Sequence, residues 1–227
     1  MGRGPKVWLA TDQTKTSVVY IEILRGLLPR SVGVSVREFA LIPYQRSVGP
    51  SVGSLVTGMG GFDPKRDRVL VVHDWENDRT DEQDRSRRER VCVRIRALLE
   101  RKLGVEPHQV WVWLVPPTTE GLYFMLAELG FTAVRKCLAD VPDRDVKRLG
   151  AQRMAVARAP SGPAPGPRKL ELDQMLCLRG PRKVRLAEQV AAAIKRDLAT
   201  SDVQSRLDAT GAVCMSELVE LSRQLAR

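Results

Sequence analysis

The chain has 227 residues, of which 43% are hydrophobic, and its 37 Lys and Arg residues outweigh 27 Asp and Glu residues to give a net charge of +10. This length and hydrophobic content exclude wholesale disorder and allow one sizeable domain, alone or with an appendage. No run of about 18 apolar residues occurs, which excludes a membrane-spanning helix at the level of sequence.

The basic excess favours a nucleic-acid partner, because phosphate neutralisation dominates the affinity of such complexes. The alternative is that the chain is rich in arginine for reasons unrelated to nucleic-acid binding, since the arginines are spread along the whole chain. The four cysteines contain no CxxC pair, and the N-terminus lacks the apolar segment of a signal peptide. We therefore expect free thiols and a cytoplasmic protein. With only two histidines, a histidine-rich metal site is excluded.

The first part of the chain alternates strand-like and helix-like patterns. Residues 6–10 are predicted as a strand, residues 17–28 as a helix that stops at Pro29, and residues 34–42 as a second strand. The Gly- and Ser-rich segment 43–64 favours a connecting loop.

Two alternatives stay open for that segment. A short helix could form around residues 51–57, or the glycines of residues 47–61 could cradle a phosphate or nucleotide through backbone N–H groups. The order of these glycines matches no P-loop, so a plain loop is the preferred interpretation.

The pattern continues with a buried strand at residues 69–72, a long helix at 82–103 and a strand at 109–115. A helix then begins at residue 122, and residues 132–138 are predicted as a last short strand. The alternation of strands and helices predicts an α/β protein with a mostly parallel sheet flanked by helices.

The C-terminal part differs in composition. Residues 159–168 contain most of a Pro- and Gly-rich stretch and are predicted as a linker or loop. This divides the chain into an α/β domain at 1–158 and a helical segment at 169–227, with helices around 184–198 and 213–225.

Carboxylates follow the ends of the predicted strands. Asp74, Glu76 and Asp78 come directly after the strand at 69–72, Asp12 follows the first strand and Glu120 follows the strand at 109–115. Ligands of open α/β sheets lie at the carboxyl ends of the strands, where these oxygens would suit Mg²⁺. A solvated turn that caps the next helix is the alternative for the cluster at 74–78.

This order of elements, with Asp12 after the first strand and Asp74-x-Glu76 after the third, resembles the Toprim domain, the Mg²⁺-binding domain of topoisomerases, primases and several bacterial nucleases. More narrowly, the chain resembles small stand-alone bacterial Toprim-like proteins that end in a short helical segment. The resemblance covers residues 6–140, with a weaker likeness at 183–225. The family carries a glutamate at the first position and Asp-x-Asp at the second, so both motifs depart from the pattern.

The resemblance implies that Asp74 and Glu76 hold one or two Mg²⁺ (or Mn²⁺) ions, with Asp78 and Glu120 as further ligands. Asp12 would act as general base or as an additional ligand. The function implied is a metal-dependent phosphodiesterase or nuclease, acting alone or in a bacterial defence-type complex. The alternative is a catalytically inactive module that binds nucleic acid or assembles with a partner protein through the C-terminal helical segment.

Three neighbouring features have both a functional and a structural interpretation. His73 is predicted to pack beneath the site, with a catalytic role as the alternative. Trp75 could stack on a base or pack in the core. The polar side of the helix at 82–103 carries Arg87, Arg90, Arg94 and Arg101, which could follow a phosphate backbone, although an ordinary solvated face is the preferred interpretation.

Overall fold

The structure is a computed structural model with all atoms. It describes residues 4–12, 17–41, 48–75, 82–115, 119–158, 169–176, 181–200, 220–221 and 223–225.

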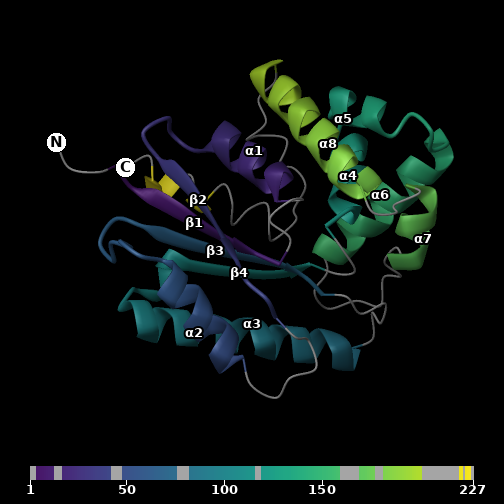
Figure 1. Ribbon diagram of the computed structural model, residues 1–227. Coiled ribbons are helices and arrows are strands. Elements are labelled where there is room, and N and C mark those ends of the chain that lie inside the picture. The colour runs from purple at the N-terminus through teal and green to yellow at the C-terminus, as the bar shows by residue number, and fades with distance from the viewer. Residues whose placement is uncertain are drawn as a thin grey trace.

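The centre of the fold is a sheet of four strands that are all parallel, in the order β2-β1-β3-β4. The strands are β1 (Lys6–Thr11), β2 (Gly33–Glu38), β3 (Arg68–Asp74) and β4 (Val110–Val115). Helices flank both faces of this sheet, as Figure 1 shows. The prediction of an α/β fold with a parallel sheet between helices is therefore confirmed, and the architecture is consistent with a Toprim-like α/β fold.

The strand order creates a switch point beside β1. From β1 the chain moves to β2 on one side, and β3 then pairs with β1 on its other side. The register places Thr11 opposite Val72, and Asp74 opposite Val115. Because all strands run in the same direction, the residues that follow β1, β3 and β4 emerge at one edge. In open α/β sheets this edge, at the switch point, is where ligands bind.

Alternate residues of each strand face opposite layers. On one face Trp8, Val69 and Val71 pack with α2 (Gly49–Gly58) and α3 (Glu82–Leu103), which lie below the sheet in Figure 1. Within α3, Ile95 and Leu99 are buried and form part of the predicted apolar stripe.

The opposite face packs on α1 (Val18–Leu27) and on a group of helices from the second half of the chain. This group comprises α4 (Gly121–Glu128), α5 (Thr132–Cys137), α6 (Asp143–Arg158), α7 (Lys169–Met175) and α8 (Pro181–Thr200). Leu172 of α7 and Ile194 of α8 belong to the same core as Leu9 and Leu70 of the sheet. The helices of residues 169–200 are thus packed into the fold rather than free to recruit a partner through these apolar residues.

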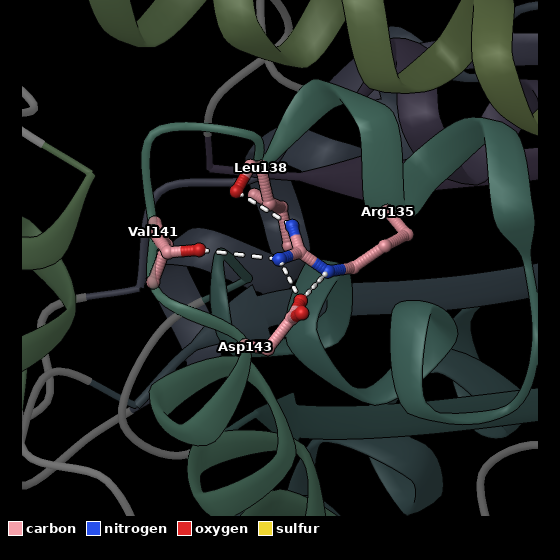
Figure 2. A network of polar contacts seen from close by, with 4 residues as sticks. All are labelled: Arg135, Leu138, Val141 and Asp143. Carbon is pink, nitrogen blue, oxygen red and sulfur yellow. Dashed lines mark hydrogen bonds and ion pairs between the residues drawn. The ribbon is translucent and has the colours of Figure 1, made fainter.

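One ionic network fixes the turn between α5 and α6. The guanidinium of Arg135 donates hydrogen bonds to the carbonyls of Leu138 and Val141 and to the carboxylate of Asp143, as Figure 2 shows. Arg135 holds the pKa of the Asp143 carboxyl below its ordinary value. The turn directs α6 back onto α4, where Gly150 packs against the backbone of Phe124.

Three predictions of local structure were wrong. Residues 49–58 form helix α2, so the preferred interpretation as a loop was wrong and the alternative of a short helix around residues 51–57 is confirmed. Pro50 suits a first helical turn, and Val52 and Leu55 are buried against the sheet. Residues 132–137 form helix α5 rather than a strand. Its first backbone N–H groups, those of Ala133 and Val134, donate to the carboxylate of Asp197 on α8.

The third wrong prediction concerns the end of the second strand. Strand β2 ends at Glu38, before the predicted end at residue 42. Helix α6 had no counterpart among the predicted elements. The linker at 159–168 lies outside the described residues. Within the described part of the chain, none of the helices combines the length and the apolar character needed to cross a membrane.

Candidate functional site

Asp74 is the last residue of β3 and its side chain is buried, with 3% exposure. Burial is the main reason that its pKa rises, to about 7, and the nearby charges of Glu120 and Asp12 raise it further. A hydrogen bond from Thr119 and the cation of Lys183 act in the opposite direction. Asp74 is therefore a carboxyl group that gains or loses its proton close to neutral pH.

Asp12 follows β1 directly and is half-buried. Burial raises the pKa of its carboxyl, while His73 and Lys183 lower it in part. Since β1 and β3 are neighbours, the two carboxylates meet at the switch point of the sheet, close enough to interact electrostatically.

Glu120 is the third carboxylate at this edge, and only 1% of it is exposed. It occupies the N-cap position of α4, where the partial positive charge of the helix end favours an anion. Its Oε1 atom lies 2.8 Å from Nζ of Lys183. Its Oε2 atom has no hydrogen-bond partner among the described residues. A buried carboxylate oxygen without a donor is costly, so this atom is available to a ligand.

Lys183 reaches the carboxylates from the first turn of α8. Burial by itself would lower the pKa of Lys183, but Glu120, Asp74 and Asp173 outweigh it and raise that pKa above its ordinary value. The side chain is consequently an ammonium ion at physiological pH. Lys183 comes from the C-terminal helical segment, and its place in the sequence gave no indication of this role.

A chain of hydroxyl groups orients Asp74. Tyr20 Oη donates to Thr119 Oγ1 at 3.3 Å, and Thr119 Oγ1 donates to Asp74 Oδ1 at 2.5 Å. Thr119 and Tyr20 are 7% and 4% exposed, so this contact is shielded from water. The hydroxyl of Tyr123 is also buried near Glu120 and Asp74, and burial raises its pKa well above the ordinary value.

His73 has a structural role that its hydrogen bonds define. Its Nε2 atom accepts from the backbone N–H of Leu41 at 3.1 Å, so Nδ1 carries the proton and donates to the carbonyl of Asp74 at 2.7 Å. Both ring nitrogens are thereby used, and His73 packs beneath the site as predicted.

Trp75 is 1% exposed and lies in the core with Val71 and Ile95, so its structural interpretation holds and it is not placed to stack on a base.

The structure thus gathers Asp12, Asp74 and Glu120 at one edge, whereas Glu76 and Asp78 lie outside the described residues. The described residues contain no group of three Asp, Glu, His or Cys side chains spaced to hold a metal ion. The oxygen donors and the unpartnered Oε2 of Glu120 still match the chemistry that Mg²⁺ requires. Three residues of the site were not predicted from the sequence: Lys183, Thr119 and Tyr20. Only Thr119 could have been suspected from the local sequence, because it directly precedes Glu120.

We compared the chain with protein-family models, with curated proteins and with solved structures, and found no match.

Proposed function

We propose that the protein is a Toprim-like, Mg²⁺-dependent phosphodiesterase that acts on a nucleic-acid backbone. The observation that carries the proposal is the convergence of Asp12, Asp74 and Glu120 at the switch point of a parallel sheet, two of them almost wholly buried. Two buried carboxylates and a half-buried one, without a matching number of cations, are unfavourable unless a positive ligand joins them.

The roles follow from position. Asp74 and Glu120 would hold the ion, together with Glu76 and Asp78 of the segment after β3, and the ion would supply charge stabilisation at the phosphoryl group. Asp12, the most exposed of the three described carboxylates, is suited to accept a proton from the attacking water.

The substrate class is inferred from charge. The net charge of +10 favours a polyanion. Helix α3 starts just after the segment that follows Asp74, and its Arg90 and Arg94 are exposed. A phosphate backbone that lies along α3 would therefore pass close to the acidic edge. A cytoplasmic location and a role in a defence-type complex remain part of this proposal.

The test is a cleavage assay with supercoiled DNA, single-stranded DNA, duplex RNA and single-stranded RNA, each with Mg²⁺ and with Mn²⁺. We expect metal-dependent cleavage that falls about 100-fold or more in Asp74→Asn. Glu188→Gln, which changes an exposed carboxylate of α8, is the matched control and should cleave like the wild type. The proposal is wrong if no substrate is cut with either metal, or if Asp74→Asn retains activity.

A second candidate is an inactive Toprim-like module that binds nucleic acid or assembles with a partner protein. Two observations favour it: Lys183 already neutralises one oxygen of Glu120, and the described side chains form no three-ligand metal group. A titration in which Mn²⁺ does not bind, combined with salt-sensitive binding of duplex DNA, would select this candidate over the enzyme.

A further inference from the structure

A cavity of about 590 Å³ lies between the turn that joins α5 to α6, the end of α7 and the first half of α8. The buried part of its lining is apolar and consists of Leu138, Val141, Leu176 and Leu186, each at most 9% exposed. A volume of this size with a mainly apolar lining is typical of a small-molecule site. Among the described residues, this lining shares no side chain with the acidic edge of the sheet.

Two sets of contacts hold the walls of the cavity in place. Arg135 donates hydrogen bonds to the carbonyls of Leu138 and Val141, which fixes the course of the turn between α5 and α6 (Figure 2). The thiol of Cys137 donates to the carbonyl of Gln189 at 3.6 Å and so joins α5 to α8. Because the walls are fixed before a ligand arrives, little affinity is lost to ordering of the protein on binding.

The rim of the cavity carries an excess of positive charge. The exposed residues of its lining are Asp140, Arg182, Arg185 and Gln189. Asp140 is the only acid among the described residues of the lining, and its Oδ2 atom lies 3.6 Å from a guanidinium nitrogen of Arg182. The charge of Arg185 therefore has no counterpart in the described lining. One uncompensated cation beside a buried apolar surface fits a ligand with a single negative charge.

We propose that this cavity binds an amphipathic anion, a molecule with an apolar body and a carboxylate at one end. The apolar body lies against the four buried side chains of the lining, where it is removed from water. The carboxylate accepts hydrogen bonds from the guanidinium of Arg185, whose planar fork matches its two oxygens. This inference goes beyond the proposed function and does not depend on it.

The test is a calorimetric titration of the full chain with octanoate, octanol and octyltrimethylammonium, each below the concentration at which it forms micelles. The three probes have similar apolar chains and differ in the charge of the head group. We expect octanoate to bind saturably, with one molecule per chain, and about threefold or more tighter than octanol, because an exposed ion pair contributes modestly. Octyltrimethylammonium should bind more weakly than octanol.

Two variants locate the bound molecule. Arg185→Gln removes the charge at the rim and should weaken octanoate about threefold while leaving octanol unchanged. Gln189→Trp places a large side chain at the mouth of the cavity and should abolish the binding of both. Lys195→Gln is the matched control, because Lys195 is an exposed cation of α8 outside the described lining, and it should bind like the wild type. Thermal melts check that each variant folds.

Three outcomes would overturn the proposal. The first is that octanoate does not bind saturably, or that the three probes bind with equal affinity. The second is that Lys195→Gln weakens octanoate as much as Arg185→Gln, because the net charge of the chain would then attract the anion. The third is unchanged binding in both Arg185→Gln and Gln189→Trp, which would place octanoate elsewhere on the chain. If Gln189→Trp does not fold, the comparison of Arg185→Gln with Lys195→Gln decides the question.

Discussion

Thr119 Oγ1 donates a hydrogen bond of 2.5 Å to Oδ1 of Asp74, and this contact joins the last residue of β3 to the residue that precedes the N-cap of α4. The bond is buried, and the second partner of Thr119, Tyr20, fixes the direction in which its proton points. Asp74 thus combines two properties, a defined orientation and a strongly raised pKa. Both can be measured in the protein without metal.

The first prediction concerns the pH dependence of stability. Because the folded state raises the pKa of Asp74 from 3.8 to about 7, the folded protein binds a proton there more tightly than the unfolded chain. The free energy of unfolding should therefore decrease as the pH rises from about 4 to about 7, by up to about 4 kcal/mol from this group. Thermal melts in EDTA over that range measure the change.

Asp74→Asn keeps the shape and the acceptor oxygen but carries no charge. We expect it to melt at a higher temperature than the wild type at pH 8, and at a similar temperature near pH 4. Glu188→Gln changes an exposed carboxylate and should leave the pH profile unaltered. A lower melting temperature of Asp74→Asn at pH 8 would contradict this account of the buried charge.

The second prediction concerns Thr119. Its hydrogen bond lowers the pKa of Asp74, so Thr119→Val should raise that pKa further. The midpoint of the pH-dependent loss of stability should move to higher pH, whereas Thr119→Ser, which keeps the hydroxyl, should leave it near the wild-type value. An unmoved midpoint in Thr119→Val would show that the hydroxyl does not act on Asp74.

The third prediction uses two helical glycines with opposite surroundings. A Cβ at Gly150 would lie 2.7 Å from the carbonyl oxygen of Phe124, so Gly150→Ala must push α6 away from α4. We expect a loss of about 1–3 kcal/mol in the free energy of unfolding. A Cβ at Gly53 of α2 would meet no atom within 4 Å, so Gly53→Ala should instead gain about 0.5–1 kcal/mol from helix propensity. Denaturant titrations compare the two.

The fourth prediction concerns the contact between α8 and α5. Asp197 accepts hydrogen bonds from the backbone N–H groups of Ala133 and Val134, and so caps α5 from another helix. Asp197→Ala should lower the free energy of unfolding by about 1–2 kcal/mol. Glu188→Ala, at an exposed position of the same helix, should have little effect. Equal stabilities of the two variants would argue against the cap.

The fifth prediction concerns the proposed nucleic-acid surface. Arg90→Gln combined with Arg94→Gln should weaken duplex binding at low salt and reduce the slope of log affinity against log salt by about 2, one for each lost phosphate contact. Asp74→Asn should leave that slope unchanged, because it does not alter α3. If the double variant binds like the wild type across salt concentrations, α3 does not contact the backbone.

The apolar patterns in the sequence determined the sheet and its long helices. The alternation of strand and helix, the strands at β1, β3 and β4, and the apolar stripe of α3 could all be predicted, because each depends on which face of one element is buried. The convergence of Asp12, Asp74 and Glu120 could also be predicted, since parallel strands end at one edge.

Only the tertiary structure decided the rest. Residues 132–137 have a strand-like composition and became helical because Asp197, remote in the chain, caps their first N–H groups. Lys183 lies at the site because α8 packs on α1 and α5. No local pattern in residues 181–200 indicates that packing. Local periodicity specifies which side of an element faces the core, but contacts between distant elements arise only when those faces pack together.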